Sequence, residues 1–286
     1  MARPPYRLTT PDDITTPVIV ASPHSGRHYP WNFMRRTVLD DRAVRTSEDA
    51  FMDRLVDAAP ELGAPLLVAE YPRAYTDLNR SADELDPAVV EGVRYPSQNP
   101  RISSGLGVIP RVVANGRAIY RGKITKDEAE ARIENVWRPY HACLDGLIRQ
   151  AEARFGEAVL LDFHSMPHEA LDSVSRPGGR RPEVVLGDRF GAAAAPEFVE
   201  ELDAAFSAAG LVVSRNAPFA GAYVTQAYGR PQRGRHAVQV EIDRSLYMNE
   251  RLIRPNSNFD AVRGVITSVL ERMIRGANTQ MPLAAE

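Results

Sequence analysis

Residues 158–167 read Ala-Val-Leu-Leu-Asp-Phe-His-Ser-Met-Pro, and this stretch decides the fold class. Its apolar run, 158–163, does not alternate with polar residues, which is typical of a strand covered on both faces in a mostly parallel sheet. Further apolar runs occur at residues 17–22, 65–70, 183–186, 211–214 and 237–242. Helical patterns lie between the runs, at residues 47–59, 125–155, 192–209 and 259–275. Strands that alternate with helices predict an α/β fold.

The helical pattern at 125–155 carries two further signals. Thr125 and Glu128 form a capping box, which predicts the start of the helix. Pro139 lies inside the pattern and predicts a kink or a break. In the pattern at 47–59, Ser47 is expected to cap a helix whose first turn contains Glu48 and Asp49.

The length of 286 residues fits one large domain, and we find no linker that separates two cores. Residues 81–118 are rich in Pro, Gly, Ser and Asn and show little periodicity. A long irregular insertion in a compact domain is usually functional or disordered. Residues 173–182 are expected to form a mobile surface loop. We therefore expect a single domain over residues 1–286, with an active-site insertion at about 81–118.

Composition excludes several classes of function. The net charge is -2, so the protein has no positive electrostatic field that would attract nucleic acid or an anionic membrane. Cys143 is the one cysteine, which excludes an intrachain disulfide and any site that needs paired thiolates. No apolar run precedes Pro17, and no segment approaches the roughly 20 apolar residues of a membrane span. We expect a cytoplasmic protein, and the sequence does not predict its oligomeric state.

His24 and His164 each follow an apolar run, and each is followed by a serine. In open α/β sheets, sites collect beyond the carboxyl ends of the strands. Imidazole is a common zinc ligand, and a catalytic zinc site needs three protein ligands and one open position. The alternative is that each histidine only bonds a neighbouring loop. Because two histidines share this pattern, we interpret them as a pair of ligands to one divalent metal ion.

The third ligand should be a carboxylate, and Glu48 and Asp49 are the candidates. Acidic residues at a helix N-terminus are also favoured by the helix dipole without any metal, so this alternative stays open.

Three more sets of residues are expected at the same edge. Glu241 lies within an apolar strand, where burial is costly unless the carboxylate is paired, and where its pKa would suit a general base. Asn79 and Arg80 predict a clamp for an anion, although arginine is abundant and Arg80 alone would favour a surface ion pair. Arg244 follows the strand that carries Glu241. Phosphate-binding glycine loops and a nucleophile elbow are absent from the sequence, so covalent catalysis is disfavoured.

Several blocks resemble the N-formylglutamate amidohydrolase family. They are VIVASPHSGRHYP at 18–30, SEDAFMDRL at 47–55, YPRAYTDLNR at 71–80, LLDFHSMP at 160–167 and NAPFAGAYVTQAYGRP with GRHAVQVEIDRSLYMNE between 216 and 250. The Asp-Leu-Asn-Arg element is also similar to aspartoacylase and, more distantly, to the zinc carboxypeptidases. The blocks span nearly the whole chain.

The resemblance implies a three-layer α/β/α domain with a mostly parallel mixed sheet, like the zinc carboxypeptidases and phosphorylase/hydrolase folds. It implies a zinc ion (Zn²⁺), with another divalent metal as an alternative, held by two histidines and one carboxylate. His24 and His164 would take the imidazole roles. The relatives' His-x-x-Glu is not kept, because Arg27 stands third after His24. The family pattern favours Asp49 as the carboxylate, with Glu48 as the alternative.

The resemblance also implies a reaction. Glu241 would be the general base and Asn79 with Arg80 the carboxylate clamp. Apart from the resemblance, we expect Arg73 or Arg121 to support the oxyanion, and Arg244 to contribute to substrate binding. The reaction would release formate and L-glutamate from N-formyl-L-glutamate in histidine degradation. The alternatives are an aspartoacylase- or carboxypeptidase-like hydrolase of another N-acyl amino acid, and a non-catalytic module that binds amino acids. The expected partner is thus a small-molecule N-acyl amino acid.

Overall fold

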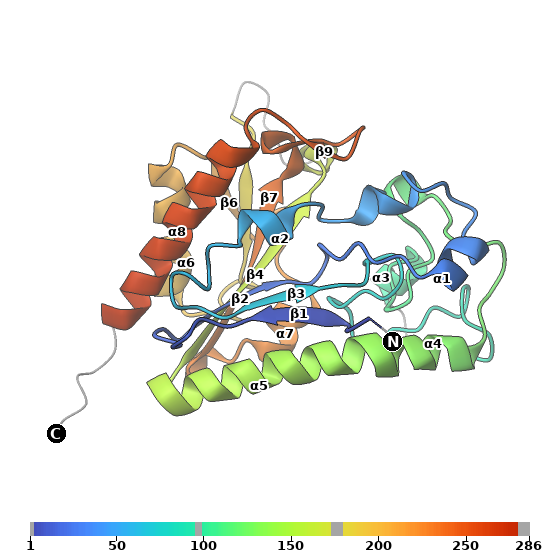
Figure 1. Cartoon of the computed structure of the whole chain (residues 1–286), viewed down its shortest axis with the longest axis horizontal. Helices are drawn as coiled ribbons and strands as arrows, with labels where there is room; N and C mark the ends of the chain where they lie inside the picture. Colours follow the sequence, from blue (N-terminus) through green and yellow to red (C-terminus); the bar gives the residue numbers. More distant parts are fainter. Residues whose placement is uncertain (1–2, 95–98, 173–179, 280–286) are drawn as a thin grey trace.

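A mixed β-sheet forms the centre of the molecule (Figure 1). The computed structural model describes residues 3–94, 99–172 and 180–279. Seven of the strands in these residues form one sheet in the order β1-β3-β2-β4-β7-β5-β6. They are β1 Tyr6–Thr9, β2 Val18–Ser22, β3 Leu66–Ala69, β4 Ala158–Met166, β5 Val184–Gly187, β6 Val213–Arg215 and β7 Arg235–Asp243. Only the pairs β1/β3 and β5/β7 are antiparallel, so the predicted mostly parallel mixed sheet is confirmed.

Each of the six predicted strands is present, because each apolar run lies in or next to the sheet core. All residues of β2, β3, β4 and β5 are buried. Strand β4 continues through Met166, so His164 lies inside the strand rather than after it. Strand β1 was not predicted. It is an exposed edge strand, Tyr-Arg-Leu-Thr, and it carries no apolar run.

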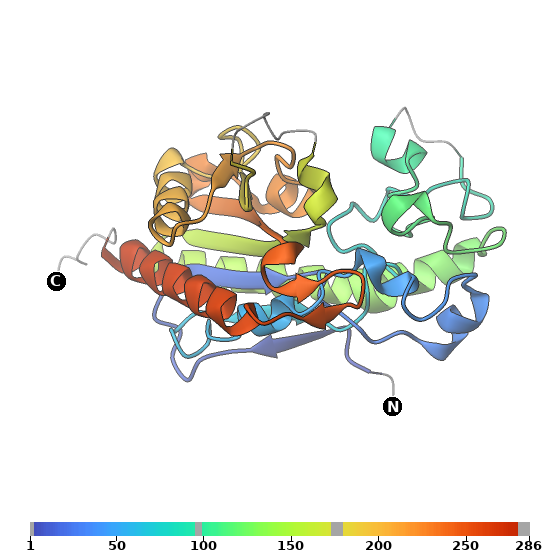
Figure 2. The same cartoon turned by 90° about the horizontal axis from the view of Figure 1, so that it is seen from above.

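Helices cover both faces of the sheet, as Figures 1 and 2 show. Adjacent residues of a strand point to opposite faces, so β4 contributes to two cores. Val159, Leu161 and Phe163 pack with residues of α6 Pro196–Ala208 and α8 Phe259–Thr279. Leu160 packs on the other face with residues of α5 Arg138–Phe155. The three-layer α/β/α arrangement is therefore confirmed.

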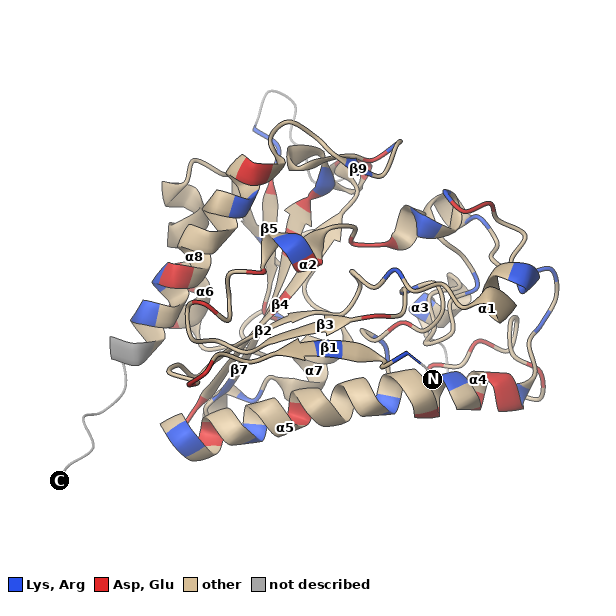
Figure 3. Cartoon of the chain, in the orientation of Figure 1, with Lys and Arg blue, Asp and Glu red and all other residues tan. Residues whose placement is uncertain are grey.

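The remaining short elements lie mostly around the ends of the strands. They are α1 Trp31–Arg36, α3 Pro100–Ser103, α4 Lys126–Arg132, α7 Tyr223–Tyr228, β8 Met248–Asn249 and β9 Arg254–Pro255. The insertion at 81–118 contains α3 and the 3-10 turn Ala114–Gly116, and it is otherwise irregular in the residues described. Residues 173–179 of the predicted mobile loop lie outside the described residues. No helix in the described part is long and apolar enough to cross a membrane. Residues of both charges are interspersed along the chain (Figure 3).

The predicted helix at 125–155 forms with a π-helical stretch, Ile133–Trp137, between α4 and α5. The Thr125 side chain accepts a hydrogen bond from the Glu128 backbone N–H, which confirms the predicted cap. Pro139 lies in the first turn of α5. Because proline has no N–H to bond the carbonyl four residues earlier, the wider π turn before it lets the helix continue without a break.

The predicted helix at 47–59 is wrong. Residues Val44–Ser47 form a 3-10 turn, and α2 covers only Met52–Leu55. Between them, Phe51 has a φ of 67°, a left-handed conformation that interrupts a helix. Ser47 therefore ends a turn and does not cap a helix, and Asp49 lies on irregular backbone.

Candidate active site

A cavity of about 550 Å³ opens beyond the carboxyl ends of β2, β4 and β7. One wall carries His24, His164 and Glu241, and another comes from the insertion and includes Arg101, Leu106 and Ala114–Gly116. The stretch 218–222 completes the lining. The insertion therefore contributes one wall of this cavity.

A row of polar side chains lies on one face of β4 and β7. His164 pairs with Glu241 and Asp162 pairs with Gln239 in this parallel pair, so all four side chains share a face. Earlier on the same face of β4, Leu160 belongs to the core beneath α5. The face thus changes from apolar to polar toward the carboxyl ends of the strands, and His164, Gln239 and Glu241 of this polar row line the cavity.

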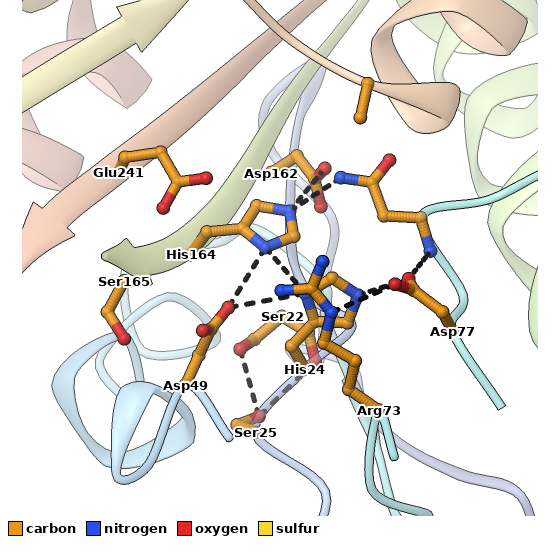
Figure 4. Close-up of polar contacts among 12 residues, drawn as sticks. Ser22, His24, Ser25, Asp49, Arg73, Asp77, Asp162, His164, Ser165 and Glu241 are labelled. Atoms are coloured by element: carbon orange, nitrogen blue, oxygen red, sulfur yellow. Dashed lines mark hydrogen bonds and ion pairs between the residues drawn. The ribbon is translucent and has the colours of Figure 1, made fainter. Parts of the chain in front are cut away.

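A carboxylate fixes each histidine ring (Figure 4). Nε2 of His24 lies 2.7 Å from Oδ1 of Asp77, and Nε2 of His164 lies 2.9 Å from Oδ2 of Asp162. A carboxylate only accepts, so each Nε2 carries the donated hydrogen. The Nδ1 atoms are then left to face each other, 3.1 Å apart.

Asp49 completes a cluster with the two Nδ1 atoms. Its Oδ2 lies 3.0 Å from Nδ1 of His164 and 3.5 Å from Nδ1 of His24. Ligand atoms in a tetrahedral zinc site with bonds of about 2.0–2.1 Å lie about 3.3 Å apart. Three electron-rich atoms this close need a positive charge between them, so these residues fit a divalent metal ion.

The local backbone brings Asp49 to this position. Its N–H donates to the carbonyl of His24 at 3.0 Å. Arg244 Nη2 donates to Asp49 Oδ1 at 3.0 Å, and Arg244 also bonds Ser165 and the Thr46 carbonyl. Burial alone would raise the pKa of Asp49, but hydrogen bonds with His164 and His24 hold it well below its usual range. The surroundings of Asp49 therefore favour its ionised form, which can face a cation.

Burial likewise opposes the charged form of His164. Asp162 and Asp49 overcome this effect and raise the pKa of His164 well above its usual range. The arrangement thus favours positive charge at the centre of the cluster.

Glu48 belongs to a different network. Its Oε1 accepts hydrogen bonds from the Tyr29 hydroxyl at 2.6 Å and from Nε of Arg45 at 2.9 Å. Its Oε2 accepts from Nη2 of Arg45 at 3.1 Å. Asp49, and not Glu48, therefore lies with the two histidines.

Glu241 faces the cavity beside His164. Its Oε1 accepts a hydrogen bond of 2.8 Å from Nε2 of Gln239. Burial raises the pKa of Glu241, against the attraction of His164. A buried carboxylate with a raised pKa that faces a cavity is suited to take up and return a proton.

Asn79 lines the cavity, but its amide bonds the protein itself. Its Oδ1 accepts from the backbone N–H of Val224 at 2.8 Å. Its Nδ2 donates to Oε1 of Gln239 at 3.1 Å and lies 3.3 Å from Nε2 of His164. Asn79 therefore helps to hold the polar row, which the sequence did not indicate.

The predicted arginines occupy different places. Arg73 lines the cavity and donates to Oδ2 of Asp77 at 2.9 Å. Arg80 is buried in the cavity wall and donates to the carbonyls of Leu106 at 2.8 Å and Asn79 at 2.7 Å. Arg244 lines the cavity but bonds Asp49 and Ser165. Arg121 is exposed and is not part of the lining, so it is not placed to support an oxyanion.

Sequence reasoning missed Gln239 and the orienting role of Asp162. Both stand two residues before a predicted site residue on the same strand, Glu241 and His164 respectively. Residues two apart on a strand share a face, so this spacing is the signal that would have found them. A further buried histidine, His236, is not part of the cavity lining. It lies at the opposite end of β7, where its Nδ1 accepts from the Ala195 N–H.

The fold and the cavity together define an α/β protein with a candidate metal-binding active site. The family model described as N-formylglutamate amidohydrolase matches residues 16–248. This chain belongs to the N-formylglutamate amidohydrolase family.

Individual relatives agree over most of the chain. The N-formylglutamate deformylase of Pseudomonas aeruginosa is 32% identical over 264 residues, covering 90% of this chain and 92% of the relative. The N-formylglutamate deformylase of Pseudomonas putida is 30% identical, with 82% of each chain covered. The crystal structure of N-formylglutamate amidohydrolase from Ralstonia eutropha JMP134 superposes with a TM-score of 0.90 at 34% identity, covering 96% of this chain and 99% of that one.

Proposed function

We propose that this protein hydrolyses N-formyl-L-glutamate to formate and L-glutamate with a zinc ion held by His24, Asp49 and His164. The observation that carries the proposal is the convergence of these three side chains, with their ligand atoms 3.0 to 3.5 Å apart, next to the cavity that His24 and His164 line. Membership of the family supports the substrate.

The aspartates prepare the histidines for this role. Asp77 and Asp162 accept the Nε2 hydrogens of His24 and His164, which leaves both Nδ1 lone pairs available as ligands. Arg244 holds Asp49 by its other oxygen. Bound zinc would supply a Lewis acid that polarises the formyl carbonyl and lowers the pKa of water.

Glu241 carries the proton in this proposal. Its carboxylate accepts a proton from the attacking water, and the same oxygen then returns the proton to the amine that leaves as L-glutamate. Gln239 bonds Oε1 of Glu241 and so fixes the orientation of the carboxylate. Arg73, in the cavity wall beside Asp77, is the cation that we assign to the developing oxyanion.

A two-part measurement tests the proposal. Formate and L-glutamate are quantified after incubation of the purified protein with N-formyl-L-glutamate, and bound metal is determined on the same preparation. We expect equal amounts of both products and about one zinc ion per chain. Absence of turnover by zinc-loaded protein would reject the substrate, and full turnover by verified metal-free protein would reject the metal.

The volume of the cavity favours a second candidate. A cavity of about 550 Å³ lies within the range of about 300–1,000 Å³ that holds drug-sized ligands, so larger acyl groups are a second possibility for the same hydrolysis. A panel of N-formyl-, N-acetyl- and N-succinyl-glutamate separates the two. The substrate with the highest kcat/KM of the three identifies the preferred acyl group.

A further inference from the structure

Arg101 brings a positive charge to the cavity. It lies in α3 of the insertion, lines the cavity and is half-buried. Its guanidinium makes no hydrogen bond or ion pair with residues 3–94, 99–172 or 180–279. A cavity-lining cation without such a partner is available for an anionic ligand.

The other three arginines of the cavity are already bonded. Arg73 pairs with Asp77, and Arg244 pairs with Asp49. Arg80 donates to two backbone carbonyls, including that of Leu106. Arg101 therefore differs from these three arginines, because its guanidinium N–H groups are available to bind a ligand.

Arg80 and Arg101 are linked through Leu106. The Leu106 N–H donates to the Arg101 carbonyl at 2.9 Å, and Nε of Arg80 donates to the Leu106 carbonyl at 2.8 Å. This link keeps the segment that carries Arg101 against Arg80.

Few carboxylates lie near the guanidiniums of Arg80 and Arg101 in the described residues. Burial lowers the pKa of Arg80, and Arg73 and Arg101 lower it further against the attraction of Asp77. Asp77 is shared by Arg73 and His24, and Oε2 of Glu84 lies as far as 4.0 Å from Nε of Arg80. Around Arg80, three guanidiniums meet the two carboxylates Asp77 and Glu84, and Arg73 is attracted by Asp49 and Glu241 as well. A carboxylate of a ligand beside Arg80 and Arg101 would therefore be favoured by the local charge.

The position of Arg101 selects between the two carboxylates of the proposed substrate. The scissile amide must reach the cluster of His24, Asp49 and His164, and the α-carboxylate is attached to the carbon next to that amide. The side-chain carboxylate lies further along the molecule. Arg73 adjoins the cluster through Asp77, whereas α3, which carries Arg101, lies in the insertion beyond the sheet (Figure 1). Arg101 is therefore better placed for the more distant side-chain carboxylate than for the α-carboxylate.

We propose that Arg101, supported by Arg80, binds the side-chain carboxylate of the substrate and so selects glutamate over uncharged amino acids. This inference rests on the proposed function, because it needs a substrate whose scissile amide lies at the cluster. Arg101 is then a specificity-determining residue contributed by the insertion.

Arg101→Gln, Arg101→Lys and the control Arg117→Gln test the inference. Arg117 is an exposed arginine of the same insertion and is not part of the cavity lining. For zinc-loaded Arg101→Gln we expect kcat/KM on N-formylglutamate to fall about 10–100-fold, and kcat/KM on N-formylglutamine to change less than about three-fold. Arg101→Lys should retain part of the selectivity, and Arg117→Gln should match wild type. An equal loss on both substrates, or no loss on either, overturns the inference.

Calorimetric titration with L-glutamate and L-glutamine separates this inference from the proposed function. If wild type binds L-glutamate more tightly and Arg101→Gln abolishes the difference, Arg101 reads the side-chain charge even should N-formylglutamate prove not to be hydrolysed. If the variant keeps the wild-type preference for L-glutamate, the inference is wrong whatever the turnover. Failure of wild type to hydrolyse N-formylglutamate rejects the proposed function alone.

Discussion

One hydrogen on each imidazole decides what His24 and His164 can do. Because Asp77 and Asp162 take the Nε2 hydrogens, the Nδ1 atoms meet at 3.1 Å with Asp49 beside them. Without a cation, lone pairs at this distance repel each other. The same carboxylates that cost free energy to bury therefore prepare the site for a metal ion.

The first prediction concerns these ligands. His24→Ala and His164→Ala should each lose bound zinc and activity together, because two ligands do not make the three-ligand site that catalytic zinc requires. Metal analysis and formate release on the same samples check this. His236→Ala, a buried histidine at the far end of β7, is the control and should keep its metal. A histidine variant that keeps full activity without metal would contradict the proposed site.

The second prediction concerns the proton carrier. Glu241→Gln should keep fold and metal but lower turnover about 10²–10⁴-fold, the usual contribution of a positioned general base. The substitution is nearly isosteric, so lost packing cannot account for a large effect. Circular dichroism and zinc content verify the variant before kcat is measured. Turnover within a few-fold of wild type would make Glu241 a structural residue.

Two side-chain hydrogen bonds help to hold the insertion against the rest of the domain. Arg80 bonds the carbonyl of Leu106, and Trp137 at the end of the π-helical stretch donates from Nε1 to the carbonyl of Arg80 at 2.9 Å. The wall of the cavity that carries Arg101 therefore depends on a side chain adjacent to Asn79 of the polar row.

The third prediction follows from this connection. Arg80→Ala should lower kcat/KM on N-formylglutamate about 10–100-fold, because the Leu106 carbonyl loses a charge-assisted hydrogen bond and the cavity wall that carries Arg101 loses its support. Arg80→Lys should recover only part of this loss, because a point charge cannot replace the planar fork. Steady-state kinetics check the series, with exposed Arg121→Ala as a control within about two-fold of wild type. Unchanged kcat/KM in Arg80→Ala would exclude a role for it in binding.

Elements were predictable where local sequence and burial agree. The apolar runs at 17–22 and 158–163 became β2 and β4, because both are covered by helices on each face. The prediction of a helix at 47–59 was wrong, because helical spacing does not indicate the left-handed φ of Phe51. Nor does it indicate the long-range contacts of Asp49 with His24 and Arg244. The edge strand β1 has no pattern of its own and forms by pairing with β3.

The same limit applies to side-chain roles. The sequence brought His24, His164 and Glu241 to one edge of the sheet, because strand ends converge there. It could not show that Arg244 bonds Asp49 across 195 residues, or that the Asn79 amide bonds Gln239 across 160. Such partners depend on the tertiary arrangement and leave no local signal.

Acid stability is a property of the whole molecule, and His141 contributes to it. This buried histidine bonds the Leu78 carbonyl through Nε2 at 2.9 Å and the Tyr228 hydroxyl through Nδ1 at 2.8 Å. It therefore joins α5, the segment before Asn79, and α7. Burial lowers the pKa of His141 to about 4.

The fourth prediction gives the sign and size of this contribution. In the unfolded chain, His141 has a pKa of about 6.5, so as pH falls the unfolded chain takes up a proton before the folded one. The contribution is complete above about pH 6.5 and is lost toward about pH 4, at about 1.4 kcal/mol per pH unit. Urea unfolding at pH 7 and pH 5 should show that wild type loses about 2 kcal/mol more than His141→Gln. Equal losses would mean that His141 ionises freely in the folded protein.

The order of the strands has a consequence for how the protein is made. Strand β4 lies between β2 and β7, and the guanidinium that holds Asp49 belongs to Arg244, just after β7. Synthesis proceeds from the N-terminus, so His24 and Asp49 leave the ribosome long before their partners exist. A nascent chain that ends before residue 235 has β4 unpaired on one side and no Glu241. On the proposed assignment, the complete centre can therefore form only after most of the chain has emerged, and a product that ends before residue 235 lacks the proposed proton carrier.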